Sequence, residues 1–80
     1  MYSRSKYIVT EDNDVIIFSA VISHDYFSSV GLKIKSAGFC TIYSEDNNVH
    51  VSCFGESHSL KILSHPKEDQ FLIERMLSND

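Results

Sequence analysis

Two runs of alternating residues on either side of the tetrad Glu45–Asn48 constrain the fold of this chain more than any other feature. Asp and Asn side chains cap nearby backbone amides and tolerate left-handed φ/ψ, so the tetrad predicts a tight turn. A turn centred there pairs Tyr43 with His50, Ile42 with Val51, Thr41 with Ser52, Cys40 with Cys53 and Phe39 with Phe54. One sheet face is then apolar and the other polar and aromatic, as a half-buried antiparallel sheet requires.

A third strand is predicted after this hairpin. If Gly55–His58 is the next turn, Cys53 faces Leu60 and Val51 faces Ile62, which again fall on the apolar face, while Lys61 points outward. The stretch from Lys33 to Leu63 therefore predicts a three-stranded meander. It is interrupted by the small residues Ser36–Gly38, which favour a bulge over a bend or a close approach of another backbone.

The N-terminal part predicts another hairpin. Residues 1–5 are expected to form a loose tail, and Lys6–Thr10 and Val15–Val21 are rich in β-branched and aromatic residues. A turn centred on Asp12-Asn13 pairs Val9 with Ile16 and Tyr7 with Phe18. Because both faces of the second run are apolar, we expect this strand to be central or covered on both sides.

Two helices are predicted. Ser23–Gly31 favours one or two turns, with Ser23 as N-cap and Gly31 just past the end. Ser64-His65-Pro66 followed by Glu68 and Asp69 is a strong helix start. An apolar stripe of this second helix should lie on the sheet, and Glu68, Glu74 and Arg75 should lie outside; the stripe consists of Phe71, Leu72, Ile73, Met76 and Leu77.

The predicted fold is a single α+β domain over residues 1–80, in the order β-β-short α-β-β-β-α. It has an antiparallel sheet of about five strands with the C-terminal helix on one face. One helix and one further turn cannot cover five strands, and the far face carries Phe39, Tyr43 and Phe54. We therefore expect a homodimer that buries this face, or an exposed aromatic patch.

Composition limits the partners and the location. The net charge is −4, and the seven Lys and Arg residues are scattered among eleven acidic ones, so a nucleic-acid partner is not expected. The one route to it is a small patch of Lys33, Lys35 and Lys61. No apolar run approaches twenty residues, and the N-terminus lacks the apolar core of a signal peptide, so the expectation is a cytoplasmic protein without a membrane span.

The two cysteines oppose each other directly in the predicted register. Thiols in an intracellular chain are normally reduced and buried, which favours two small core hydrophobes, with a disulfide or redox pair as the alternative. His50 and Cys53 point to opposite faces, and the chain has no C-x-x-C and no H-x-x-x-H. We therefore predict no metal and no cofactor.

The loop Gly55–Ser59 is the most polar tight loop, and its G-x-S-x-S pattern invites comparison with the G-x-S-x-G nucleophile elbow. That elbow joins a strand to a helix in a large α/β sheet, whereas this loop joins two short strands. We expect Ser57, Ser59 and Glu56 to satisfy turn amides. A hydrolase-like or small-molecule site that uses Ser57, His58 and His24 is the alternative.

The polar sheet face is the other candidate site. Tyr43 and His50 are cross-strand neighbours there, with Phe39 and Phe54 farther along, which is typical of a ligand-binding face or a wet interface, although an ordinary solvated face has the same pattern. The leading hypothesis is a non-catalytic protein-interaction module that acts as a homodimer and binds a protein partner through this face or an open edge strand.

Overall fold

The structure is a computed structural model that describes residues 2–78, and it confirms the α+β class. The elements follow in the order β1 (Tyr2–Thr10), β2 (Val15–Phe18), α1 (Asp25–Ser29), β3 (Ile34–Glu45), β4 (Asn48–Phe54), β5 (Glu56–Ser57), β6 (Ile62–Leu63) and α2 (Pro66–Ser78). In the described part of the chain, no helix is long and apolar enough to cross a membrane.

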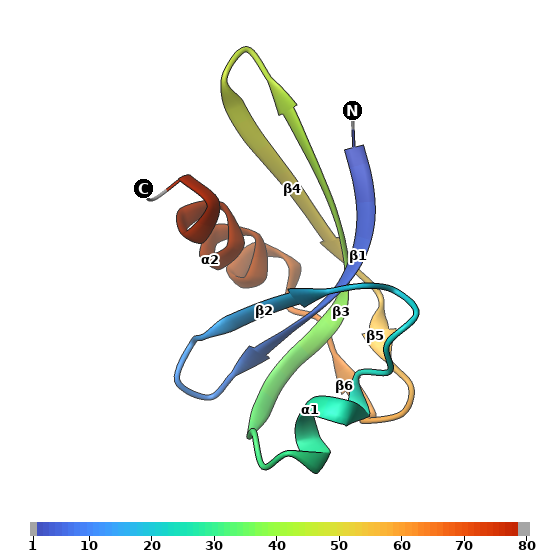
Figure 1. Ribbon diagram of the computed structural model, residues 1–80. Helices are drawn as coiled ribbons and strands as arrows, with labels where there is room; N and C mark the ends of the chain where they lie inside the picture. The colour runs from blue at the N-terminus through green and yellow to red at the C-terminus, as the bar shows by residue number, and fades with distance from the viewer. Residues whose placement is uncertain (1, 79–80) are drawn as a thin grey trace.

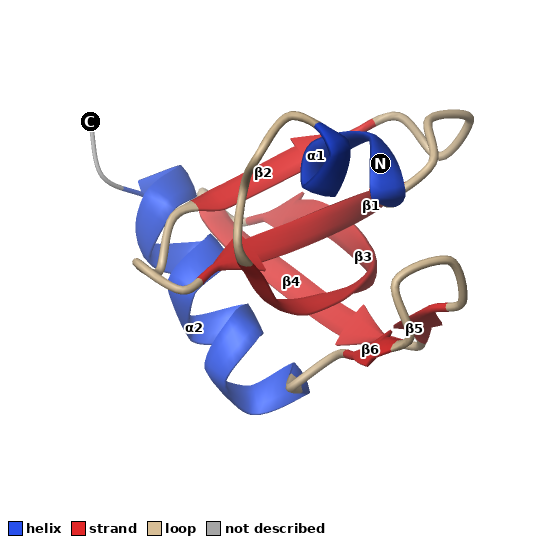
Figure 2. Cartoon of the chain, turned by 90° about the horizontal axis from the view of Figure 1, so that it is seen from below, coloured by secondary structure: helices blue, strands red, loops and turns tan. Residues whose placement is uncertain are grey.

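Four strands form one antiparallel sheet in the order β2-β1-β3-β4, and β5 and β6 form a small separate hairpin. Figure 1 shows the β3–β4 hairpin projecting away from the rest of the molecule, with the start of β1 beside it. Figure 2 shows α2 alongside β4. The segment around α1 lies on the other side of the sheet, where Phe27 contacts Phe18 of β2 and His24 packs against Phe39 of β3. We call the face that α2 covers the inner face and the opposite face the outer face.

The predicted register of the β3–β4 hairpin is confirmed at every pair, from Phe39 opposite Phe54 to Tyr43 opposite His50. Asp46 and Asn47 at the tip have φ of 52° and 68°. A two-residue turn with both φ values positive matches the twist of the strands that it joins, and Asp and Asn tolerate it. Local turn chemistry therefore fixes this hairpin.

The predicted register of the first hairpin is wrong by one residue, because Val9 pairs with Val15 and Tyr7 with Ile17. The Thr10 N–H donates to the Asp14 carbonyl oxygen, and this bond closes a loop of three residues, the last of them Asn13 at φ 66°. The Thr10 hydroxyl accepts the Asp14 N–H at 3.1 Å. This loop is one residue longer than a turn centred on Asp12-Asn13. β2 is an edge strand with half-buried side chains, and β1 is central.

The predicted loose tail is also wrong for residues 2–5, since β1 begins at Tyr2 and pairs with β3 up to Tyr43. Met1 lies outside the described residues. The sequence of this segment has no alternation of apolar residues. It is a strand because the twelve-residue β3 offers unpaired backbone groups on that side, and neighbouring strands satisfy each other's backbone whatever their side chains.

The predicted third strand of the meander does not pair with β4. Leu60 and Lys61 lie in the turn between β5 and β6, and Ile62 pairs with Ser57. The free edge of β4 is covered by α2 instead: the Cys53 N–H donates to Gln70 Oε1 at 2.9 Å.

The same cover extends to the next outward amide of β4. The Val51 N–H donates to Glu74 Oε2 at 3.3 Å, so Glu74, predicted outside, is half-buried against the sheet. Four residues of a helix rise about 6 Å, and two residues of a strand span about 6.7 Å. Two acceptors that lie four residues apart on α2 therefore match two amides that lie two residues apart on β4.

Gly38 lies in a continuous part of β3, so the bulge predicted there is wrong. The register shift lies between Val9 and Thr10, which pair with Ser36 and Ile34 and leave Lys35 unpaired. Gly38 is required for a different reason: a Cβ atom at this position would lie 2.6 Å from the Phe54 carbonyl oxygen. The alternative of a close backbone approach therefore holds.

The core lies between the inner face and α2, and its buried residues are Tyr7, Val9, Cys40, Val51, Cys53 and Ile73. The apolar stripe of α2 is narrower than predicted, because Ile73 is buried and Leu72 half-buried, whereas Phe71 is 61% exposed. The helix sits at the edge of the sheet beside β4, so its flank rather than a wide stripe meets the strands.

α1 covers one end of the outer face. Its predicted N-cap, Ser23, is wrong, since His24 occupies that position without a capping side-chain hydrogen bond. Gly31, at φ 96°, stands just past the helix end as predicted. The α2 start at Pro66 is also confirmed.

Candidate functional site

The outer face carries two stacked aromatic pairs across β3 and β4. The ring centroids of Phe39 and Phe54 are 5.9 Å apart with planes 18° apart, and those of Tyr43 and His50 are 5.0 Å apart at 25°. Tyr43 and Phe54 are each 39% exposed. The structure therefore brings the four predicted residues of this face together as a ladder of rings open to solvent.

Two cations from β1 extend this ladder. Arg4 Cζ lies 4.8 Å from the ring centroid of Phe39 and 5.6 Å from that of Phe54, and Lys6 Nζ lies 6.0 Å from that of Phe39. Cations above ring faces are attracted by the ring quadrupole. Arg4 was not predicted from the sequence, because residues 1–5 were expected to form a tail. An alternation of Arg4, Lys6 and Ile8 across from β3 was the signal available.

One end of the outer face is closed by the segment around α1. The His24 ring is packed edge-on against Phe18 and Phe39, with centroids 5.5 and 5.8 Å away, and Phe18 also contacts Phe27. His24 Nε2 donates to the Gly38 carbonyl oxygen at 2.9 Å, an assignment that fits the acceptor. We give the name open half to the remainder of this face, from Arg4 and Phe39 to the hairpin tip.

Charge is distributed unevenly along the open half. Lys6 and Arg4 pair with Phe39 and Thr41, at the end near α1. At the other end, β3 alternation places Glu45 on the same face as Tyr43, and Asp46 comes next in the turn. The open half is therefore cationic at one end, aromatic in the middle and acidic at the other end.

The Gly55–Ser59 loop begins beside that surface, where Gly55 lies next to the Phe39 ring, and its Ser57 side chain is buried. Ser57 is 1% exposed, and its hydroxyl oxygen accepts the Leu60 N–H at 3.2 Å and lies 3.3 Å from Ser59 Oγ. His58 is exposed and forms no hydrogen bond with Ser57 in the described part of the chain. The Ser57 hydroxyl therefore bonds within the turn, and the structure does not bring His58 into hydrogen-bond contact with it.

A Ser-His-Asp group that was not predicted from the sequence lies where β3 meets the start of α2. Asp69 Oδ2 accepts hydrogen bonds from the hydroxyls of Tyr7 and Ser36, and from the His65 N–H at 2.8 Å. His65 Nδ1 lies 3.2 Å from Ser36 Oγ. In a catalytic triad the carboxylate orients the histidine ring, whereas here it binds the serine directly. Ser36 is also fully buried, so this is a structural network.

The buried phenol and thiols are held in their neutral forms. Burial, with the hydrogen bond to Asp69, raises the pKa of Tyr7. Burial raises the pKa of Cys40 to about 11 and that of Cys53 to about 12. Both cysteines are buried free thiols, as expected for core residues. Among residues 2–78, no group of three or more His, Cys, Asp and Glu side chains could hold a metal ion.

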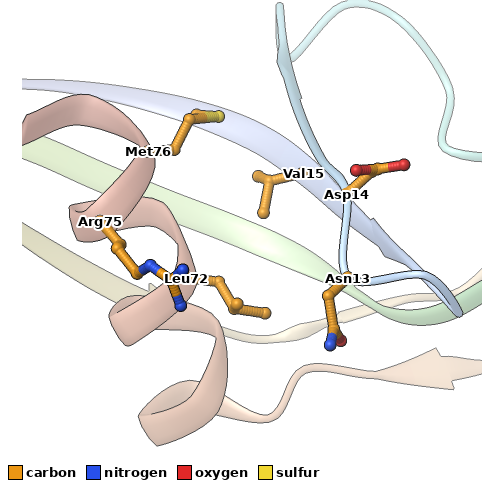
Figure 3. A pocket seen from close by; sticks show the side chains of 6 residues that line it. All are labelled: Asn13, Asp14, Val15, Leu72, Arg75 and Met76. Carbon is orange, nitrogen blue, oxygen red and sulfur yellow. The ribbon is translucent and has the colours of Figure 1, made fainter. Parts of the chain in front are cut away.

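A groove of about 450 Å³ separates β2 from the C-terminal half of α2 (Figure 3). Val15 on the strand side and Leu72 and Met76 on the helix side supply its apolar lining, and Arg75 projects from the helix at its rim. Asn13 and Asp14 close the end at the first hairpin. The groove was not predicted from the sequence, because β2 and the C-terminal helix that form it lie far apart in the chain.

Comparison with family models, with curated proteins and with solved structures finds no match for this chain. The surfaces of the molecule are therefore the guide to its function.

Proposed function

We propose that this protein is a non-catalytic interaction module that acts as a homodimer through the open half of its outer face. One observation carries the proposal: the stacked Phe39–Phe54 pair lies under Arg4 on the open half of the outer face, beyond the end that the α1 segment covers. Aromatic residues and Arg are the types most enriched in protein interfaces. The expected cytoplasmic location belongs to the same proposal.

The charge pattern of the open half favours a second copy as its occupant. Two copies can pack face to face with their β3 strands running in opposite directions. Phe39 of one copy then lies opposite Glu45 of the other. Lys6, at the level of Phe39, then lies nearest to Glu45 of the second copy, and Arg4 lies two residues farther along, twice by symmetry. The Tyr43–His50 pair falls near the middle, where Arg4 of the second copy can lie over the rings.

The dimer should depend on concentration. Six residues of strand span about 20 Å and three strands about 14 Å, so the open half covers only about 280 Å² of sheet plane. The side chains that project from the sheet add to this area, but the buried area still lies at the small end of the range for specific protein–protein interfaces. We therefore expect a dissociation constant in the micromolar range.

Sedimentation equilibrium from about 1 to 500 µM tests the proposal. A reversible dimer is expected for the wild type, and Tyr43→Lys and Phe54→Asp should each yield a folded monomer by circular dichroism. The matched control is Phe71→Asp, which places a carboxylate at an exposed aromatic residue of α2, away from this face, and should leave the dimer intact. A chain that stays monomeric throughout, or a dimer unchanged by both face variants, would refute the proposal.

A charge exchange tests the orientation. Arg4→Glu and Glu45→Arg should each weaken the dimer about tenfold, and the double variant should restore it, because attraction across the interface returns with reversed sign. Within one chain, Arg4 pairs with Thr41, which lies four residues along β3 from Glu45, a separation of about 13 Å. Rescue by the double variant would therefore report a contact between two copies. A double variant as weak as the sum of the two single variants rejects this orientation.

A further inference from the structure

The backbone of β2 is open for pairing on the side away from β1. The Thr10 N–H donates to the Asp14 carbonyl oxygen at 2.9 Å, so these residues form the hydrogen-bonded pair that closes the first hairpin. Hydrogen-bonded and non-hydrogen-bonded pairs alternate along an antiparallel ladder. Val15 and Ile17 therefore belong to non-hydrogen-bonded pairs, and their N–H and C=O groups point outward.

The two edges of the sheet are treated differently. Outward amides of β4 donate to Gln70 and Glu74, whereas the outward groups of Val15 and Ile17 have no hydrogen-bond partner among residues 2–78. An unprotected edge is a template for another strand. A peptide backbone, with its regular donors and acceptors, is the chemistry that satisfies it.

The groove lies at the start of this edge. Val15 belongs to both the edge and the groove lining, and Leu72 and Met76 face it from α2 (Figure 3). A strand added to β2 runs about 4.8 Å from it and directs alternate side chains toward the helix. One apolar side chain of such a strand would cover Met76, which is partly exposed in the free protein.

The charge of Arg75, on the helix side of the groove and away from Asp14 at the hairpin end, favours an acidic residue beside that apolar side chain of the added strand. Arg75 is exposed, its guanidinium carbon lies 6.0 Å from the Phe71 ring, and no carboxylate in the described residues pairs with it. A planar guanidinium at the rim suits a carboxylate on the ligand.

We propose that β2 and α2 form a binding site for an extended peptide, which adds to β2 as a fifth strand of the sheet. The peptide is recognised by main-chain hydrogen bonds to Val15 and Ile17, by one apolar side chain against Leu72 and Met76, and by one acidic residue at Arg75. The site uses neither the rings nor the cations of the outer face. A failure of the dimer proposal would therefore not affect the peptide-site proposal.

The probe is a displayed library of random heptapeptides, panned on the folded Tyr43→Lys variant so that self-association does not interfere. We expect enriched peptides with alternating apolar residues and an acidic residue. Bound at saturation, a synthetic enriched peptide should slow amide exchange at Val15 and Ile17 at least tenfold. Exchange at Ile16, whose N–H already faces β1, and at Val51, whose N–H is covered by α2, should change less than twofold.

Side-chain variants complete the test. Arg75→Glu should weaken the selected peptide about tenfold, and Met76→Lys should do the same by placing a charge in the apolar lining. Lys61→Glu, which makes the same charge reversal in the β5–β6 turn, should change affinity less than twofold. A library that yields no enriched peptide, a peptide that leaves exchange at Val15 and Ile17 unchanged, or equal weakening by Lys61→Glu and Arg75→Glu overturns the proposal.

Discussion

The Tyr7 hydroxyl donates a hydrogen bond to Asp69 Oδ2, although the two residues lie 62 positions apart and Asp69 is 1% exposed. The same oxygen accepts the Ser36 hydroxyl and the His65 N–H. One carboxylate therefore connects β1, β3 and the start of α2. In the part of the chain that the structure describes, every buried side-chain nitrogen and oxygen has a partner.

Removing members of this network should destabilise the fold in proportion to the groups left unpaired. Tyr7→Phe removes one donor and should lower the free energy of unfolding by about 1–2 kcal/mol, whereas Asp69→Ala removes the acceptor of two buried hydroxyls and of the part-buried His65 N–H and should lower it by about 3 kcal/mol or more. Urea unfolding followed by circular dichroism measures both. The control is Tyr26→Phe at a 56% exposed phenol, expected within about 0.5 kcal/mol of the wild type. Equal effects of Tyr7→Phe and Tyr26→Phe would show that the network contributes nothing.

The α2 cover of β4 should protect this edge from self-association. Gln70→Ala with Glu74→Ala removes both acceptors, and the two uncovered amides should lower stability by about 1–2 kcal/mol and promote aggregation. Light scattering during incubation near the unfolding midpoint reports the second effect. Glu74→Gln keeps an acceptor and should behave like the wild type, as should Glu68→Ala at an exposed position of the same helix. Scattering that rises as fast in Glu68→Ala as in the double variant argues against an edge-specific role.

His24 should make the fold acid-sensitive. Burial lowers the pKa of His24 below its usual value of 6.5, and the charge of Lys6 acts in the same direction, while the hydrogen bond to Gly38 and the charge of Asp25 oppose them. Below pH 6.5 the unfolded chain binds a proton that the folded chain resists, so this contribution to stability is complete above 6.5 and is lost as pH falls toward the lower folded pKa.

Melting temperatures between pH 7.5 and 5 measure this effect. His24→Gln, whose amide N–H can reach the Gly38 carbonyl, should flatten the profile in that range, while His58→Gln at an exposed ring should leave it unchanged. A His24→Gln profile parallel to that of the wild type would exclude His24 as the cause.

The opposed cysteines should be unreactive in the folded protein. Burial raises the pKa of Cys40 to about 11 and of Cys53 to about 12, so at pH 8 the nucleophilic thiolate is scarce and inaccessible. Iodoacetamide followed by mass spectrometry should label neither residue in buffer and both in 8 M urea. The matched control is Thr41→Cys on the more accessible outer face, which should be labelled in buffer. Labelling of Cys40 or Cys53 at the rate of this introduced cysteine would contradict their place in the core.

The sequence determined the elements that depend on the preferences of neighbouring residues. Turn-forming residues at Glu45–Asn48 and alternation on both sides fixed the β3–β4 register, and hence the sharing of one face by Phe39, Tyr43, His50 and Phe54. Pro66 after a polar cap fixed the start of α2. These features depend on neighbours in the chain, so single-residue preferences were sufficient to predict them.

Only the tertiary structure decided which backbones meet. The pairing of residues 2–5 with β3, which brings Arg4 over Phe39, and the cover of β4 by α2 depend on backbone groups that are the same in every residue. The Asp69 network and the β2–α2 groove likewise join segments more than thirty residues apart. Such contacts form only when the whole chain is packed, because no local preference encodes which distant partner will satisfy a buried donor.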